Sequence, residues 1–268
     1  MTRPGVSDLM PSRFLAASLT SDFHPVSVIL SPPRCGSTAL ARSLWQHQAF
    51  RWYLHEPCDW AYHVGLAPQH PVINTLIDRA QHSCARPAGN GVVVKEMTFQ
   101  AGDAIAEFEV ATVPVIFLIR DPRQAVHSRM CQRARDGDNP AFPAREAGWE
   151  ALLSAIAHFS DVGMPYVVVD VGDIRRNPES ALRILCRSLG LPWDASMLRW
   201  ESLPDLRLGN LGSQDAWYTR VLRSTGWQPP DAEIPPPEVF RQNGMSSVVA
   251  ESISAYQQAR NDPQFISF

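Results

Sequence analysis

Short apolar runs alternate with amphipathic stretches along the chain, and this pattern predicts alternating strands and helices. Five runs are short and rich in β-branched or aromatic residues, which is typical of buried strands. They cover residues 26–30, 50–54, 92–94, 115–119 and 166–169. Because strands that alternate with helices usually pair in parallel, we expect a central parallel sheet flanked by helices on both faces.

Helix signals stand between these runs. Apolar residues recur at helical spacing from residue 36 to about residue 48, directly after the first predicted strand. A second helix is expected to begin at Pro122, since Asp121 before it is a favourable N-cap residue. A third is expected to begin at Pro178, with Asn177 as its cap.

Composition supports one folded domain without a strong overall charge. The chain has 268 residues, of which 45% are hydrophobic and 19% charged, so it can bury a large core. Its formal net charge of −3 provides no overall field to hold nucleic acid or an anionic membrane. Any anion site must therefore be local. No long linker interrupts the chain, and we expect an N-terminal extension over residues 1–25 and one α/β domain over residues 26–268.

The five cysteines are scattered and form no close pair, which predicts neither a disulfide framework nor a zinc site. This pattern favours a reducing compartment. Residues 1–25 lack the long apolar core of a signal peptide, and every apolar run is shorter than the roughly 20 residues that cross a bilayer. We therefore expect a cytoplasmic protein that needs no metal and has no membrane span.

Two stretches depart from the alternation of strands and helices. Residues 130–145 are rich in arginine, aspartate, glycine and proline, and residues 228–238 contain five prolines. Such segments usually form surface loops, and loops commonly carry functional residues. We expect both stretches to be loops over a site.

The segment Ser-Pro-Pro-Arg-Cys-Gly-Ser-Thr, residues 31–38, lies between a predicted strand and a predicted helix. Free amide N–H groups and the positive end of a helix dipole bind phosphate at such a place. The segment is nearly a P-loop, but Ser31 replaces the first glycine and Ser37 replaces the lysine that pairs with β- and γ-phosphates. A triphosphate donor is therefore disfavoured, while Arg34 places a cation inside the loop.

Residues 33–38 resemble the 5′-phosphosulfate loop of sulfotransferases that use 3′-phosphoadenosine 5′-phosphosulfate (PAPS). Residues 116–123, Ile-Phe-Leu-Ile-Arg-Asp-Pro-Arg, followed by Ser128, resemble the 3′-phosphate motif of the same family. A weaker likeness, to a strand, a short acidic turn and a capped helix, covers residues 166–192. The two motifs in this order are more specific than either alone, because short turns with glycine and serine are common.

The resemblance implies a sulfotransferase architecture similar to that of P-loop proteins, with PAPS as donor, 3′,5′-adenosine bisphosphate (PAP) as product and no metal. Two phosphates on one nucleotide need two anion sites, and neighbouring strand ends can provide them. The family's C-terminal Arg-Lys-Gly loop has no counterpart in this sequence. The motifs imply that the donor-binding residues are Arg34, Cys35, Gly36, Ser37, Thr38, Ala39, Arg120 and Ser128.

Sulfuryl transfer to a hydroxyl requires in-line placement, cations near the moving oxygens and a base for the acceptor proton. The resemblance implies that Arg34 stabilises the departing PAP. Lys95, at the end of a predicted strand, is expected to add positive charge over the sulfuryl oxygens or to orient the acceptor. These two residues and the base make up the predicted catalytic set.

The base is implied by resemblance to bacterial and heparan-modifying sulfotransferases, in which a glutamate after the second strand is thought to deprotonate the acceptor. Glu56 matches that position, and His55 and Glu96 remain alternatives. In cytosolic members of the family, a histidine two residues beyond the strand-end lysine is the base. Met97 occupies that position here, so that route is closed.

Two other functions remain open from the sequence. A P-loop phosphotransferase for a small metabolite would need a lysine at position 37, and a non-catalytic nucleotide-binding protein would need no base. Oligomeric state is unconstrained. Residues 217–224 either contact adenine or the acceptor, or form an amphipathic helix, which we prefer. A small hydroxylated acceptor is favoured over a polysaccharide by a group of aromatic residues near the predicted site. They are Trp45, Trp52, Tyr53, Trp60 and Tyr62, for which a place in the core is the alternative.

Overall fold

Seven strands of the described chain form one sheet in the order β3-β2-β4-β1-β5-β6-β7, in which every neighbouring pair is parallel except β2 and β3. The computed structural model describes residues 19, 22–64, 76–83, 86–208, 215–231 and 233–268. The strands are β1 (Val26–Ser31), β2 (Phe50–His55), β3 (Ile77–Asp78), β4 (Gly91–Met97), β5 (Val115–Ile119), β6 (Tyr166–Asp170) and β7 (Phe265–Ile266). The prediction of a largely parallel α/β sheet is therefore confirmed.

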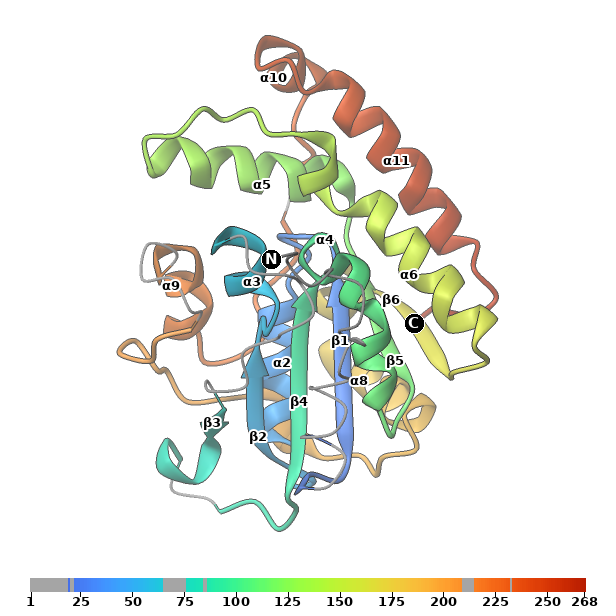
Figure 1. Ribbon diagram of the computed structural model, residues 1–268. Helices are drawn as coiled ribbons and strands as arrows, with labels where there is room; N and C mark the ends of the chain where they lie inside the picture. Colours follow the sequence, from blue (N-terminus) through green and yellow to red (C-terminus); the bar gives the residue numbers. More distant parts are fainter. Residues whose placement is uncertain (1–18, 20–21, 65–75, 84–85, 209–214, 232) are drawn as a thin grey trace, which may run out of the picture.

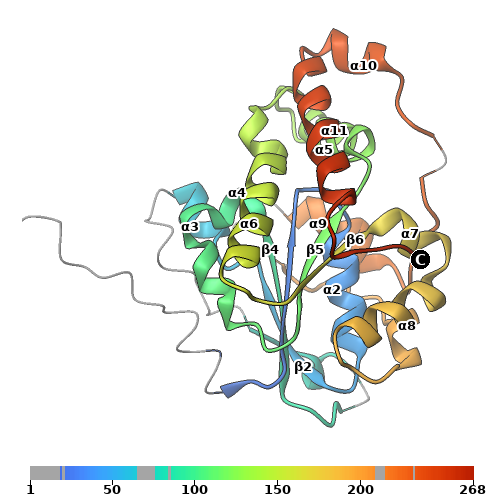
Figure 2. The same cartoon turned by 90° about the vertical axis from the view of Figure 1, so that its right-hand side faces the viewer.

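Helices cover both faces of the sheet, as the edge-on view of Figure 2 shows. One core joins the sheet to α4, α5, α6 and α11, and a second joins it to α2, α7, α8 and α9 (Figure 1). The helices are α2 (Ser37–Gln46), α3 (Asp59–Val64), α4 (Thr98–Ala101), α5 (Pro122–Arg135), α6 (Trp149–Asp161), α7 (Val171–Arg176), α8 (Pro178–Ser188), α9 (Asp215–Arg223), α10 (Pro237–Gln242) and α11 (Ser246–Arg260). Short 3₁₀ turns are η1 (Arg79–Gln81), η2 (Gly102–Val110), η3 (Ala144–Ala147) and η4 (Ala195–Leu198).

The predicted helix starts are confirmed. A carboxylate oxygen of Asp121 accepts a hydrogen bond from the Arg123 N–H at 2.9 Å and caps α5. The amide oxygen of Asn177 accepts one from the Ser180 N–H at 3.3 Å and caps α8. These side chains satisfy N–H groups that have no partner within the helix, so each helix begins where its strand or loop delivers the chain.

Strand β4 is longer than predicted. It continues past Lys95 through Met97, which pairs with Ser31 of β1. Because side chains alternate along a strand, Lys95 and Glu96 point to opposite faces of the sheet. Lys95 therefore lies inside the strand rather than at its end, and faces the side of the sheet that α2 and α9 cover.

Both predicted loops are partly wrong. Helix α5 continues through Arg135, so residues 130–135 are helical, and the arginines that suggested a loop are the basic residues of its last turn. The residues that follow do not line the site pocket described below. Residues 228–231 and 233–236 do form a loop at that pocket, and helix α10 begins at Pro237.

Most of the predicted extension, residues 1–25, lies outside the described residues, and its boundary stays a prediction. Within the described ranges, no helix has both the length and the apolar character required to cross a bilayer. The cytoplasmic location also stays a prediction.

Candidate functional site

A pocket of about 260 Å³ opens at the carboxyl ends of β1, β2, β4 and β5, where the two sequence motifs meet. Most of the predicted site residues line it. They are Arg34, Gly36, Ser37, Thr38, Ala39, Glu56, Lys95, Arg120 and Ser128. Parallel strands bring residues from distant parts of the sequence to one edge in this way.

The loop after β1 has the backbone geometry of an anion site. Gly36 has a φ of 84° and precedes α2, whose first N–H groups have no acceptor within the helix. A Cβ atom at Gly36 would lie 3.1 Å from a methyl carbon of Val171, so both this tight contact and the positive φ disfavour a side chain there. Arg34 has a φ of 64°, which is unusual for a residue that is not glycine.

Cys35 is the one predicted donor residue that does not line the pocket. Its side chain is buried in the core, and its sulfur lies 3.9 Å from the Pro33 carbonyl oxygen. Burial raises the pKa of the Cys35 thiol to about 12, so the group is neutral. Any contact of Cys35 with the donor would come from its main chain.

The guanidinium groups of Arg34 and Arg120 share the pocket. Arg120 Nη1 donates a hydrogen bond to the Arg34 carbonyl oxygen at 2.8 Å, and Arg34 Nε donates to Ser128 Oγ at 3.1 Å. Burial, together with the nearby charge of Arg120, lowers the pKa of Arg34 to about 10, which leaves it charged at neutral pH. The two motifs thus place three polar side chains on one site.

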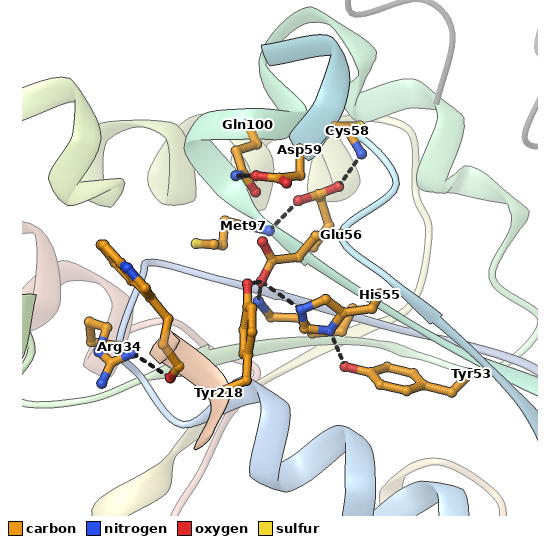
Figure 3. Close-up of polar contacts among 12 residues, drawn as sticks. Arg34, Tyr53, His55, Glu56, Cys58, Asp59, Met97, Gln100 and Tyr218 are labelled. Atoms are coloured by element: carbon orange, nitrogen blue, oxygen red, sulfur yellow. Dashed lines mark hydrogen bonds and ion pairs between the residues drawn. The ribbon is translucent and has the colours of Figure 1, made fainter. Parts of the chain in front are cut away.

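Glu56 lies across the pocket from Arg34 and is fully buried (Figure 3). Its carboxylate forms an ion pair with Lys95, accepts a hydrogen bond from the Tyr218 hydroxyl at 3.0 Å and lies 3.3 Å from His55 Nε2. Its N–H donates to the Lys95 carbonyl oxygen at 2.7 Å, which extends the pairing of β2 with β4 by one residue. The backbone φ of 46° turns the chain at this point.

The charge state of Glu56 follows from these neighbours. Burial alone would raise its pKa, but the positive charge of Lys95 and the contact with His55 outweigh burial and hold the pKa well below its usual range. Glu56 is therefore ionised at neutral pH, in a position that faces the phosphate-loop arginine across the pocket.

Comparison with known proteins gives these features a family. Residues 27–259 match the family described as "Sulfotransferase domain". The chain belongs to this family. The match covers every predicted site residue, so the family assignment and the pocket concern the same part of the chain.

The relatives extend this picture only in part. Over 85 residues this chain is 35% identical to branched-chain-amino-acid aminotransferase-like protein 2 of Arabidopsis thaliana. It is 36% identical to branched-chain-amino-acid aminotransferase-like protein 1 of the same organism, also over 85 residues. The matched segment covers 32% of this chain but only 15% of each relative. The names of these longer proteins therefore carry no activity over to it.

A solved structure described as mouse sulfotransferase SULT7A1 complexed with PAP is similar to this one, with a TM-score of 0.50. The two are 13% identical, and the alignment covers 94% of this chain and 95% of that one. At this identity the likeness shows a shared fold only, and it extends over nearly the whole length of both chains.

His55 and Glu96, the alternative bases, occupy different surroundings from Glu56. Burial lowers the pKa of His55. Its Nδ1 lies 2.5 Å from the Tyr53 hydroxyl, and its Nε2 lies 3.3 Å from a Glu56 carboxylate oxygen without completing a hydrogen bond. The ring also packs edge-on against Tyr218, with 4.7 Å between centroids. His55 therefore orients Glu56 from beside it and does not line the pocket.

Glu96 lies on the other face of the sheet from Lys95. Its two carboxylate oxygens accept hydrogen bonds from the N–H groups of Cys58, at 2.6 Å, and Met97, at 2.7 Å (Figure 3). Burial, and then the charge of Glu56, raise the pKa of Glu96 to about 8. Glu96 thus holds the turn after Glu56 in place from behind and does not line the pocket.

The five aromatic residues predicted to shape an acceptor pocket do not line it. Trp45 and Tyr53 are buried in the core between the sheet and α2, because proximity to a strand end does not determine which face a side chain takes. The aromatic residues of the pocket are instead Trp217, Tyr218 and Trp227. Helix α9 carries the first two, so the stretch expected to form an amphipathic helix is helical and also reaches the site.

Sequence reasoning missed two further pocket residues. Arg175 lies on α7, directly after β6, and Asp231 lies in the proline-rich segment. Their signals were present, since β6 is another strand that ends at the same edge and the segment was expected to cover a site. Within the described ranges, no group of three histidine, cysteine, aspartate or glutamate side chains is placed to hold a metal ion.

Proposed function

We propose that this sulfotransferase transfers the sulfuryl group of PAPS to a hydroxyl group of a small-molecule acceptor. The observation that carries the proposal is the meeting of Arg34 and Arg120 in one pocket, joined by the hydrogen bond from Arg120 to the Arg34 carbonyl oxygen. A nucleotide with two separate phosphates needs two cationic sites within its own length, and neighbouring strands β1 and β5 deliver them.

The phosphate loop and Arg34 would bind the 5′-phosphosulfate, and Arg120 with Ser128 would bind the 3′-phosphate. Backbone N–H groups at the start of α2 add donors to the first of these sites. Arg34 stays protonated at neutral pH and does not act as a general acid, so it would stabilise the departing PAP electrostatically. The mouse relative, which is described with PAP bound, supports the same choice of nucleotide.

Glu56 is the proposed base. The acceptor hydroxyl gives its proton to Glu56 while its oxygen forms a bond to sulfur, and the bond between sulfur and the bridging phosphate oxygen breaks. PAP leaves with the bonding electron pair, and Lys95 and Arg34 offset the charge on the oxygens. The support is positional, because Glu56 and Lys95 line the pocket whereas His55 and Glu96 do not.

The low pKa of Glu56 has a consequence for this step. The carboxylate is ionised before the acceptor arrives, but the adjacent Lys95 makes it a weak base. Anionic sulfuryl oxygens near Lys95 would share its positive charge and so raise the proton affinity of Glu56. Donor binding would then switch the base on, which couples deprotonation of the acceptor to the presence of the donor.

The acceptor is proposed to be a small molecule with an apolar body. The indole rings of Trp217 and Trp227 and the side chain of Val221 line the part of the pocket formed by α9 and the segment after it. Such a lining suits a hydroxylated compound of modest size better than a long anionic chain. Nothing at the site favours the phosphotransferase alternative, since Ser37 stands where a triphosphate enzyme has lysine.

The test is incubation of the protein with PAPS labelled in its sulfur and an extract of small molecules, followed by mass spectrometry of whatever gains the label. We expect labelled products that are absent when Glu56→Gln replaces the parent protein. A parallel thermal-shift series should show stabilisation by PAP without magnesium, and none by ATP with it. Stabilisation by ATP with magnesium and not by PAP would contradict the choice of donor.

A further inference from the structure

Asp231 joins two arginines of the pocket. Its Oδ2 atom accepts a hydrogen bond from Arg120 Nη2 at 2.5 Å and another from Arg175 Nη1 at 2.9 Å. The three residues come from different places, the end of β5, helix α7 and the proline-rich segment before α10. Two guanidinium groups thus converge on one acidic oxygen.

The two arginines would repel each other without an anion between them. Arg120 and Arg175 expose only 10% and 17% of their side chains, so water screens their charges weakly. Burial, and next the charge of Arg120, lower the pKa of Arg175, while Asp231 opposes this. The pair therefore forms an anion-binding seat, and Asp231 is its present occupant.

We propose that Arg120 and Arg175 together form the seat for the donor's 3′-phosphate, and that Asp231 is a built-in competitor which the donor displaces. The inference rests on the proposed function and adds Arg175 and Asp231 to it. A Cβ atom at Gly36 would lie 3.7 Å from Arg175 Nη2, so Arg175 reaches the phosphate loop as well.

Charge and geometry favour phosphate over the carboxylate. A phosphate monoester carries a charge of about −1.5 to −2 and three acceptor oxygens, against one charge for Asp231. Both arginines now share one carboxylate oxygen, whereas a phosphate gives each its own. Arg120 and Arg175 would therefore gain hydrogen bonds on the exchange.

The position of Asp231 also allows it to separate from the two arginines when a ligand binds. It exposes 34% of its side chain, more than either arginine. Its backbone carbonyl oxygen accepts only a long hydrogen bond, 3.3 Å, from Gln124 Nε2. Proline residues on both sides of it lack the N–H groups that would anchor the segment to its neighbours. The ion pair is thus the main described contact that holds this part of the segment over the pocket.

A competitor of this kind weakens donor binding in proportion to the time it occupies the seat. If Asp231 fills the seat for about nine tenths of the time, the apparent Kd for PAP is about tenfold weaker than that of the free seat. Removal of its charge should recover this factor, and removal of Arg175 should weaken only ligands that carry a 3′-phosphate.

The test is calorimetric titration of the full chain with PAP and with adenosine 5′-monophosphate. We expect Asp231→Asn to tighten PAP binding by about three- to tenfold and to change the affinity for the monophosphate by less than twofold. Arg175→Ala should weaken PAP binding by about tenfold or more, with Arg175→Lys recovering part of the loss. Glu238→Gln, which removes one negative charge from the exposed surface of α10, is the control and should change neither affinity.

Each result decides between alternatives. Unchanged or weaker PAP binding by Asp231→Asn overturns the competitor while leaving PAP as ligand. Equal losses for both nucleotides in Arg175→Ala place Arg175 at the 5′-phosphate and overturn the seat. PAP binding by Asp231→Asn but not by the parent protein supports the competitor in its strongest form. No PAP binding by any variant overturns the proposed donor, and this inference with it.

Discussion

Two charged clusters lie in the same pocket and differ in how they are held. The Glu56–Lys95 pair is almost completely buried, with 0% and 3% of the side chains exposed. Lys95 belongs to β4, and Glu56 directly follows β2 and is tied to β4 by its main-chain N–H. The cluster of Arg120, Arg175 and Asp231 is more exposed, and its acidic member comes from a proline-rich segment.

The difference separates two tasks. Groups on paired strands keep their positions whether or not a ligand is present, which suits the step in which bonds form and break. Groups on a weakly anchored segment can exchange one partner for another, which suits binding and release. In this molecule the fixed cluster, Glu56 and Lys95, is proposed to take part in the chemical step. The exchangeable cluster, Arg120, Arg175 and Asp231, is proposed to bind the 3′-phosphate of the donor.

The largest expected effect comes from the fixed cluster. Glu56→Gln keeps the shape of the side chain but removes the proton acceptor, so kcat should fall by about 100-fold or more. The affinity for PAP should change by less than twofold. Steady-state rates with labelled PAPS and calorimetric titration measure the two quantities. Unchanged turnover would assign the base to another residue.

The next effect concerns the exchangeable cluster. Arg120→Ala removes one of the two guanidinium groups of this cluster, and the Kd for PAP should rise by about tenfold or more. The Kd for adenosine 5′-monophosphate should rise much less. Equal affinity of the parent protein for PAPS and for adenosine 5′-phosphosulfate would show that the 3′-phosphate is not recognised at all.

A smaller effect tests how Glu56 is positioned. Tyr218→Phe removes the hydroxyl that donates to Glu56 at 3.0 Å but keeps the ring that packs on His55. Loss of one hydrogen bond to a carboxylate should lower kcat by about fivefold and raise the pKa of Glu56, because one donor to its ionised form is gone. The acidic limb of the rate profile should therefore move to higher pH, whereas a purely structural role for Tyr218 would leave that limb in place.

The smallest effect concerns stability rather than turnover. Glu96 has a pKa of about 8 in the folded protein, so between its usual range and that value the native state holds a proton that the unfolded chain has lost. Stability should therefore fall as pH rises through this window, by more than about 1 kcal/mol. In Glu96→Gln this decline should be absent.

Urea unfolding at acidic and at alkaline pH measures the decline. The parent protein and Glu96→Gln should be closest in stability at low pH, where both side chains are neutral, and should diverge at high pH, where only the parent buries a charge at this position. A constant difference between them would show that Glu96 titrates as it does in the unfolded chain.

Much of the fold was accessible from sequence because its signals are local. Strands β1, β5 and β6 are continuous apolar runs, and Asp121 and Asn177 cap the helices beside them in both the sequence and the structure. The predicted end of β4 was wrong, because the charge of Lys95 suggested that the strand stops there. A buried partner, Glu56, allows that charge to lie within the strand.

The site was predictable only where it is continuous in sequence. The phosphate loop and the strand end at Arg120 are such segments. Tyr218 contacts Glu56 across 162 residues, and Asp231 contacts Arg120 across 111, so no local pattern announced either contact. The five aromatic residues considered for the acceptor pocket do not line it. The reason is the same, because the tertiary fold determines which side of the sheet each ring faces.

The alternation along β4 has one more consequence. Lys95 and Glu96 are neighbours in the chain but serve opposite sides of the sheet. A slip of β4 by one position against β1 and β2 would reverse these faces, so that Glu96 would point toward the pocket and Lys95 toward the turn at Cys58. Both β1 and β2 pair in parallel with β4 and so guard against that inversion. Which charge faces the pocket therefore depends on the register of β4 as much as on the identity of its residues.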